Sequence, residues 1–241
     1  MYYALLTLLA LLTLLISNTL QAHPGSLNQQ GGHTDRSTGD YHCHRAPCST
    51  LHRQQQKAQQ DATDAQRAFS GLYDRNLWPH WTDADQDCQD TRAELLIASS
   101  RQTVTFTDPD QCTVATGRWY DPYTNRTFTH AGDLDVDHFV PLRHAHGHGG
   151  DQWDKALRQQ FANDPDNLIP VSASANRSKG ARSPDQWLPD NRLYWCEYGR
   201  HWKRIKQRYQ LMVTPQEADA LKQLLTHCSM PSTPKTTKPR P

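Results

Sequence analysis

Three short segments in the second half of the chain limit its fold more than any other feature. They are Asp135-Val136-Asp137-His138-Phe139-Val140-Pro141-Leu142, then Asn163-Asp164-Pro165-Asp166-Asn167-Leu168-Ile169-Pro170-Val171, and last Ser174-Ala175-Asn176-Arg177-Ser178-Lys179-Gly180. The first predicts a strand that ends in Asp-His, the second a turn that leads into another strand, and the third the start of a helix. Strand, loop, strand and helix in this order can bring one polar group from each piece together.

These residue types suit phosphodiester hydrolysis, which needs a base to activate water and a hard cation to neutralise charge on the phosphate. His138 is the candidate base, because imidazole titrates near neutral pH. A backbone carbonyl or the Asn167 side chain could hold its ring in one tautomer. Asp137 and Asn176 offer oxygen ligands to Mg²⁺.

Two cations and one carboxylate complete the candidate site. Arg177 and Lys179 stand where they could hold the phosphate. Asp135 lies two residues before Asp137, so a strand puts both on one face. Asp135 could support the metal ligands through hydrogen bonds, or it could be structural only.

The three segments resemble the parts of an HNH endonuclease, the ββα-metal or His-Me finger class, which also occurs in CRISPR effector nucleases and in small secreted nucleases. The likeness to secreted HNH nucleases covers about residues 72–210 and includes Asp90–Glu94, Cys112, Trp119–Tyr123 and Pro184–Pro189. It implies an α+β fold with a ββα-metal nuclease core and additional helices.

The resemblance also assigns roles to single residues. It implies that His138 is the general base, that Asn167 orients it, and that Asp137 and Asn176 bind one divalent metal. The metal would be Mg²⁺, with Mn²⁺ or Ca²⁺ as alternatives. The last position of the HNH name is Asn176 rather than His, which is a common variant.

The N-terminus predicts export. Residues Ala4–Ile16 are almost all Leu, Ala and Thr, a run too short to span a bilayer, which takes about 20 apolar residues. We interpret it as a signal peptide cleaved after Ala22, which leaves no stable membrane association and a secreted or periplasmic protein. The start carries no Lys or Arg, so an uncleaved anchor is the alternative.

The six cysteines fit an exported chain, because an even count there indicates disulfides. Spacing favours the neighbouring pairs Cys88–Cys112 and Cys196–Cys228. Cys43 and Cys48 lie among histidines, so they could pair or bind metal.

Composition divides the chain into five parts. They are a signal peptide (1–22), a His/Gly-rich module (23–50), a polar segment that is helical or loose (51–68), the nuclease domain (69–228) and a disordered Pro/Lys-rich tail (229–241). Within the nuclease domain, the pattern predicts helices from Thr91, over 153–161, over 195–209 and from Pro215, with strands at 104–106 and 114–119.

Residues 23–45 resemble the YHYH domain, a small module found beside exported nucleases and other envelope proteins. Alternation puts His42 and His44 on one strand face, and His33 could join them in a Zn²⁺ site. A Gly/His module without an ion is the alternative that we leave open.

Two other features are open at this stage. His144, His146 and His148 could bind metal, although we favour a polar, Gly-rich loop near the cleft. The basic run from Arg200 to Arg208 could bind a nucleic-acid backbone, although a solvated outer face is the plainer interpretation.

We therefore expect an exported, metal-dependent endonuclease that acts on DNA or RNA. A net charge of +1 excludes a basic coat over the whole protein, so the polyanion would meet a local patch. The rivals are a non-enzymatic envelope metal-binding protein and an effector nuclease toxin. Oligomeric state has no signature in the sequence.

Overall fold

The structure is a computed structural model that describes residues 27–29, 31–34, 41–64 and 69–228. The expected signal peptide and C-terminal tail lie outside these residues. The contacts between residues divide the chain into two compact units, and the boundary in the sequence falls between Ser49 and Thr50. Within the described parts, no helix is both long and apolar enough to cross a membrane.

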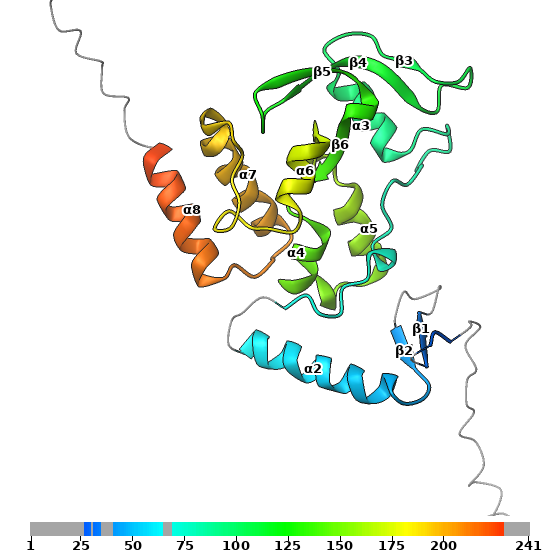
Figure 1. Ribbon diagram of the computed structural model, residues 1–241, viewed down its shortest axis with the longest axis vertical. Helices are drawn as coiled ribbons and strands as arrows, with labels where there is room; N and C mark the ends of the chain where they lie inside the picture. The colour runs from blue at the N-terminus through cyan, green and yellow to red at the C-terminus, as the bar shows by residue number, and fades with distance from the viewer. Residues whose placement is uncertain (1–26, 30, 35–40, 65–68, 229–241) are drawn as a thin grey trace, which may run out of the picture. The chain divides into compact units, whose positions relative to one another are not determined.

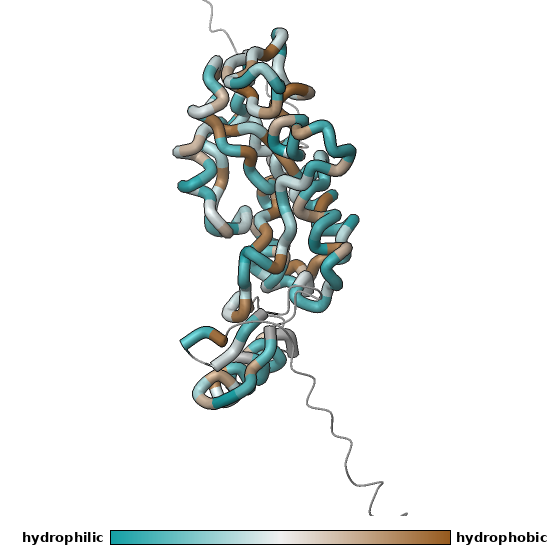
Figure 2. The backbone as a smooth tube through the Cα atoms, turned by 90° about the vertical axis from the view of Figure 1, so that its right-hand side faces the viewer, coloured by the Kyte–Doolittle hydropathy of each residue, from teal (hydrophilic) through white to brown (hydrophobic). Residues whose placement is uncertain are grey.

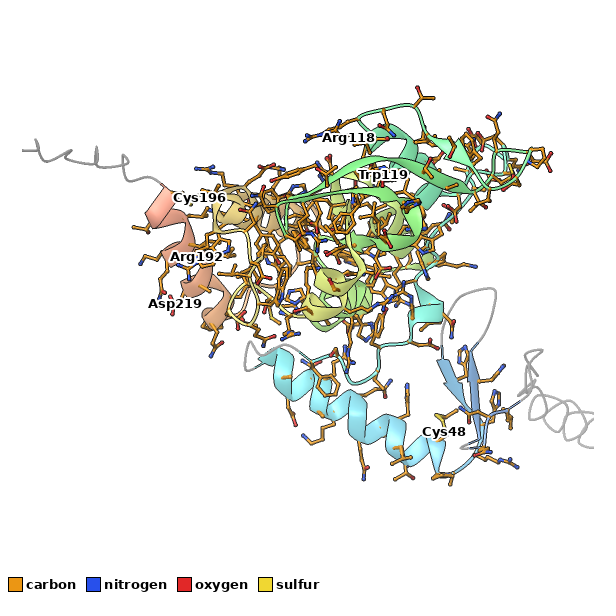
Figure 3. The ribbon with its side chains drawn as sticks, turned by 45° about the horizontal axis from the view of Figure 1, so that its top comes forward. Cys48, Arg118, Trp119, Arg192, Cys196 and Asp219 are labelled. Atoms are coloured by element: carbon orange, nitrogen blue, oxygen red, sulfur yellow. A yellow bond between two sulfur atoms is a disulfide. The ribbon has the colours of Figure 1, made fainter. Side chains whose placement is uncertain are left out.

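The N-terminal unit contains a two-stranded antiparallel sheet of β1 (Gly32–Thr34) and β2 (Tyr41–Cys43), in which His33 is paired with His42. A disulfide joins Cys43 to Cys48, which is labelled in Figure 3. The polar segment that follows is helical over most of its length, as α2 (Cys48–Asp64), and from Thr50 onward it belongs to the second unit.

The second unit contains the other elements of the described chain (Figure 1). Its helices are α3 (Thr91–Ser99), α4 (Leu142–Gly147), α5 (Lys155–Asn163), α6 (Ala173–Lys179), α7 (Trp195–Arg208) and α8 (Pro215–Cys228). Its strands are β3 (Thr105–Phe106), β4 (Val114–Asp121), β5 (Arg126–His130), β6 (Leu134–His138) and β7 (Leu168–Ser172). The fold is therefore α+β.

Strands β3, β4 and β5 form an antiparallel sheet with β4 in the middle. Adjacent side chains of β4 point to opposite faces, so Arg118 is exposed while Trp119 is fully buried (Figure 3). The Trp119 indole donates to the carbonyl of Leu96 at 2.7 Å, which fixes α3 on this sheet.

The candidate site is built on a second pair of strands. β6 and β7 are antiparallel, with Asp137 opposite Ile169 and His138 opposite Leu168. Helix α6 follows β7 directly, because the Ser172 hydroxyl accepts from the Ala175 amide at 3.3 Å and so caps the helix. This is the expected order of strand, strand and helix.

Two apolar clusters lie on the two sides of the β6–β7 pair. One holds Val136 and Leu168 together with Trp119 of the three-stranded sheet. The other holds Val171 and the aromatic side chains of α5 and α7. Hydrophobic and hydrophilic stretches accordingly alternate along the chain (Figure 2).

The C-terminal helices α7 and α8 agree with the sequence pattern and lie side by side in Figure 1. Disulfides join Cys196 to Cys228 and Cys88 to Cys112, as the spacing predicts. The expected loop at His144–His148 is largely the short helix α4 instead, because Leu142 and Ala145 pack into the aromatic cluster and stabilise a segment of low helix propensity.

Candidate active site

His138 ends strand β6 with its ring held in one orientation. Its Nε2 lies 2.8 Å from the Ala162 carbonyl at the end of α5, so this nitrogen carries the hydrogen and donates it. Among the described residues, no hydrogen bond reaches Nδ1. The neutral ring therefore presents a free lone pair at Nδ1, as a general base requires.

The surroundings keep this imidazole neutral. The Trp81 ring stacks on it, with centroids 5.4 Å apart and planes inclined by 28°. Burial, together with the positive charge of Arg75, lowers the pKa of His138 to about 3. The ring is thus unprotonated over the whole neutral pH range.

Asn167 is buried, and its side-chain hydrogen bonds go to residues other than His138. Its Oδ1 accepts from the Val140 amide at 2.9 Å, and its Nδ2 donates to the carbonyls of Val140 and Phe161. It therefore joins the chain just after His138 to the end of α5, whose Ala162 carbonyl holds the ring. The sequence left open whether a backbone carbonyl or the Asn167 side chain holds the His138 tautomer. In the structure, the Ala162 carbonyl holds it.

Asp137 points to the other face of β6, into a buried ion pair. The Lys179 ammonium lies 2.8 Å from one of its oxygens, and the Tyr123 hydroxyl donates to the same carboxylate at 2.9 Å. Lys179 also donates to the His138 carbonyl at 2.9 Å. Burial raises the pKa of Asp137, an effect that the charge of Lys179 opposes.

Asn176 meets Asp135 rather than Asp137. Its Nδ2 donates to an Asp135 oxygen at 3.0 Å, and the Arg177 guanidinium lies 3.8 Å from the same oxygen. The Asp135 side chain is one-third exposed. The Asp135 carboxylate, next to the partly exposed Asn176 amide, is therefore accessible to a hard cation.

The two expected phosphate ligands differ in exposure. Lys179 is completely buried, so its ammonium is available only to Asp137 and the His138 carbonyl. Arg177 is largely exposed. In the basic run of α7, Lys206 is buried, whereas Arg208 pairs with Asp164 and Asp166 on the surface.

The three histidines of the α4 region are all buried. His144 and His148 stack with centroids 3.7 Å apart, and their Nε2 atoms lie 3.9 and 3.8 Å from a Glu217 oxygen. These three side chains could hold a metal. In the structure, the Lys206 ammonium donates to His144 at 2.9 Å and to Glu217 at 3.1 Å, so a cation of the chain itself already neutralises the cluster.

A second group of possible metal ligands is exposed: Asp83, Asp85 and Asp87. In the N-terminal unit, the His33 ring lies 4.9 Å from that of His44 and 6.2 Å from that of His42. His33 is buried, and neither of its ring nitrogens has a hydrogen-bond partner among the described residues.

Four residues around the site have no role in the sequence-based prediction: Tyr73, Arg75, His80 and Trp81. They precede the three-part motif by more than fifty residues, and no spacing rule connects them to His138. Tyr123 belongs to a segment that the resemblance includes, but its bond to Asp137 is visible only in three dimensions.

Comparison with known proteins identifies a family that this chain matches. Residues 89–224 match the family described as the C-terminal domain of GmrSD restriction endonucleases. An uncharacterized secreted protein of Arthroderma benhamiae is 38% identical over 180 residues, which are 69% of this chain and 86% of that protein. No solved structure matches the chain.

Proposed function

This chain belongs to the family of the C-terminal domain of GmrSD restriction endonucleases, and from that premise we propose that it is an exported, metal-dependent endonuclease of the HNH type. Its substrate would be DNA or RNA. The observation that carries the proposal is the state of His138, a neutral imidazole with Nε2–H bound to a carbonyl and Nδ1 open. This ring lies in the strand, strand and helix order of a ββα-metal nuclease.

His138 would act as the general base. Its Nδ1 takes a proton from the water that attacks phosphorus, and Ala162 holds the resulting imidazolium through Nε2. Asn167 fixes the backbone on both sides of this pair, so it is a positioning residue. Trp81 covers one face of the ring and limits access of other water.

The side-chain oxygen atoms where α6 meets β6 fit a divalent cation. Asp135 and Asn176 would hold it, because both offer oxygens and the Asp135 carboxylate is accessible. Asp137, which the resemblance implies as a ligand, lies next to the Lys179 ammonium, and a second cation there would be repelled. When bound, such an ion neutralises the charge that develops on the phosphate and the leaving oxygen.

Export is part of the proposal. The relative from Arthroderma benhamiae is called a secreted protein, and three disulfides stabilise this chain. Disulfides persist in oxidising compartments. Mature protein would begin at His23, and N-terminal sequencing of processed protein checks this.

The test of the activity is cleavage of plasmid DNA and of RNA by purified protein, with Mg²⁺ and with EDTA. We expect cleavage with Mg²⁺ and none with EDTA. The His138→Ala variant should be slower by about 10²–10⁴-fold, the usual effect of losing a general base. Cleavage by His138→Ala at the wild-type rate would overturn the assignment of the base.

The buried His33 favours a second function for the N-terminal unit. A buried imidazole that has no hydrogen-bond partner among the described residues, beside His42 and His44, suits a Zn²⁺ site. Zinc content of the purified protein, compared with that of His33→Ala, tests this independently of nuclease activity.

A further inference from the structure

A segment outside the three-part motif lies against the candidate base. Trp81 stacks on the His138 ring, and the His80 ring meets it edge-on, with centroids 6.5 Å apart. The segment is fixed to the same helix end that holds His138. The Thr82 amide donates to Asn163 Oδ1 at 3.1 Å, and Asn163 follows Ala162 directly.

The backbone of this segment is unusual at Trp81. Its φ is +56°, a left-handed conformation that residues other than glycine rarely adopt. The surrounding hydrogen bonds hold it there, and the indole is thereby turned onto the His138 ring. The position of the segment relative to the base is therefore well determined.

His80 orients a neighbouring cation. Its Nδ1 lies 2.8 Å from the Trp78 carbonyl, so Nδ1 carries the hydrogen and Nε2 accepts. The Arg75 guanidinium donates to this Nε2 at 3.2 Å and also hydrogen-bonds the Tyr73 side chain. Both anchors of Arg75 are neutral side chains.

Arg75 differs in this respect from the other cations near the site. Lys179 is neutralised by Asp137, and Arg177 lies near Asp135. In the described part of the chain, no carboxylate pairs with Arg75, and the residue is exposed. The positive charge of Arg75 is therefore available to an anion. His80, which contacts the His138 ring, already holds the Arg75 guanidinium on its own side of that ring.

We propose that Arg75, held by His80 and Tyr73, binds the phosphate of a nucleic-acid backbone at the His138 side of the site. This inference rests on the proposed function and names a phosphate ligand for it. A guanidinium presents several N–H donors in a plane and can bind two phosphate oxygens at once. Lys179, one of the two phosphate ligands expected from the sequence, is buried in its ion pair with Asp137 and cannot contact a phosphate there.

The experiment separates binding from cleavage. Binding of a fluorescein-labelled DNA duplex is measured by anisotropy at several salt concentrations, in the His138→Ala background so that cleavage is slow. Arg75→Gln is compared with Arg118→Gln, which removes an exposed charge from strand β4 (Figure 3). Thermal unfolding of each variant checks that it is folded.

We expect Arg75→Gln to weaken binding about 5–10-fold and to reduce the salt dependence by about one phosphate contact, with Arg118→Gln unchanged. His80→Ala should give a smaller loss in the same direction, because the charge stays but its orientation is lost. A wild-type salt dependence in a folded Arg75→Gln variant overturns the inference.

Cleavage by the same variants in the wild-type background distinguishes the two proposals. If the wild type cleaves DNA and Arg75→Gln cleaves and binds equally well, the phosphate site is wrong and the nuclease stands. If the wild type binds DNA through Arg75 without cleaving it, the phosphate site stands and the proposed activity is wrong.

Discussion

The Lys179 ammonium lies 2.8 Å from an oxygen of Asp137, and both side chains are buried. The pair joins α6 to β6, and the additional bond from Lys179 to the His138 carbonyl fixes the end of the strand. The lysine of the Asn-Arg-Ser-Lys segment is thus an internal cation that holds strand β6 and helix α6 together beside His138.

We predict that breaking this pair destabilises the fold. Asp137→Asn leaves the Lys179 charge buried without a counter-charge, which typically costs about 3–5 kcal/mol. Lys179→Met should cost a similar amount, and the double variant should recover part of the loss. The free energy of unfolding in urea measures all three.

The control is the exposed Asp133→Asn, which removes a carboxylate from the same segment. It should change stability by no more than about 0.5 kcal/mol. Equal effects of Asp133→Asn and Asp137→Asn would contradict a structural role for the buried pair.

The proposed metal ligands can be tested by measuring the affinity for Mg²⁺. Asp135→Asn and Asn176→Ala should each raise the Mg²⁺ concentration needed for half-maximal cleavage, and excess Mg²⁺ should partly restore the rate. The fold should remain, because the Asp135 side chain is partly exposed. Titration of activity with Mg²⁺ gives the result.

A different outcome would place the ion elsewhere. If Asp135→Asn has the wild-type Mg²⁺ requirement while a folded Asp137→Asn has a higher one, the metal binds at Asp137, as the resemblance implies. The Lys179 ammonium would then have to leave that carboxylate in the active complex.

Asn167 should act through position alone. Asn167→Ala leaves the buried Val140 amide and two carbonyls without their side-chain partner, which should cost about 1–3 kcal/mol. It also frees the chain just after His138 from the end of α5, so kcat should fall while KM stays nearly constant. A fall in stability with an unchanged kcat would show that Asn167 is structural only.

Much of this arrangement follows from sequence patterns, and the exceptions have physical reasons. The 3–4 spacing of aromatic residues predicts α7 because helix periodicity is a local property. Strand β5 has no such signal: only Phe128 among its residues is apolar and partly buried. Its pairing with β4 decides its structure.

The candidate site divides in the same way. The identity of His138 and the order of the three segments are local properties, and the sequence predicts them. The sequence predicts that Asn176 lies with Asp137, but Asn176 pairs with Asp135 and Lys179 pairs with Asp137. These pairings depend on how α6 packs on β6. The approach of Arg75 and Trp81 depends on a fold contact across more than fifty residues.

Acid should destabilise the protein through its buried histidines. Burial lowers the pKa of His146 to about 4 and that of His148 to about 3, whereas an unfolded histidine titrates near 6.5. Below pH 6.5 the unfolded chain therefore binds protons that the native state does not. The free energy of unfolding should fall as the pH is lowered from 7 and continue to fall until about pH 3, where His148 also binds a proton in the native state.

His146 allows this effect to be isolated. Both of its ring nitrogens are buried without hydrogen-bond partners among the described residues, and its ring packs against Tyr73 and Trp78. His146→Phe keeps an aromatic ring there and removes the titrating group. Between pH 7 and pH 5 this variant should lose about 1–2 kcal/mol less stability than the wild type.

His146→Ala separates titration from packing. It should show the same reduced pH dependence as His146→Phe, because neither residue binds a proton. At pH 7, however, it should be less stable than the Phe variant by about 3 kcal/mol, because the contacts with Tyr73 and Trp78 are lost. Urea unfolding at pH 7, 6 and 5 measures both quantities. If the wild type and the two variants lose stability in parallel on acidification, His146 takes up its proton equally in both states, and the predicted linkage is wrong.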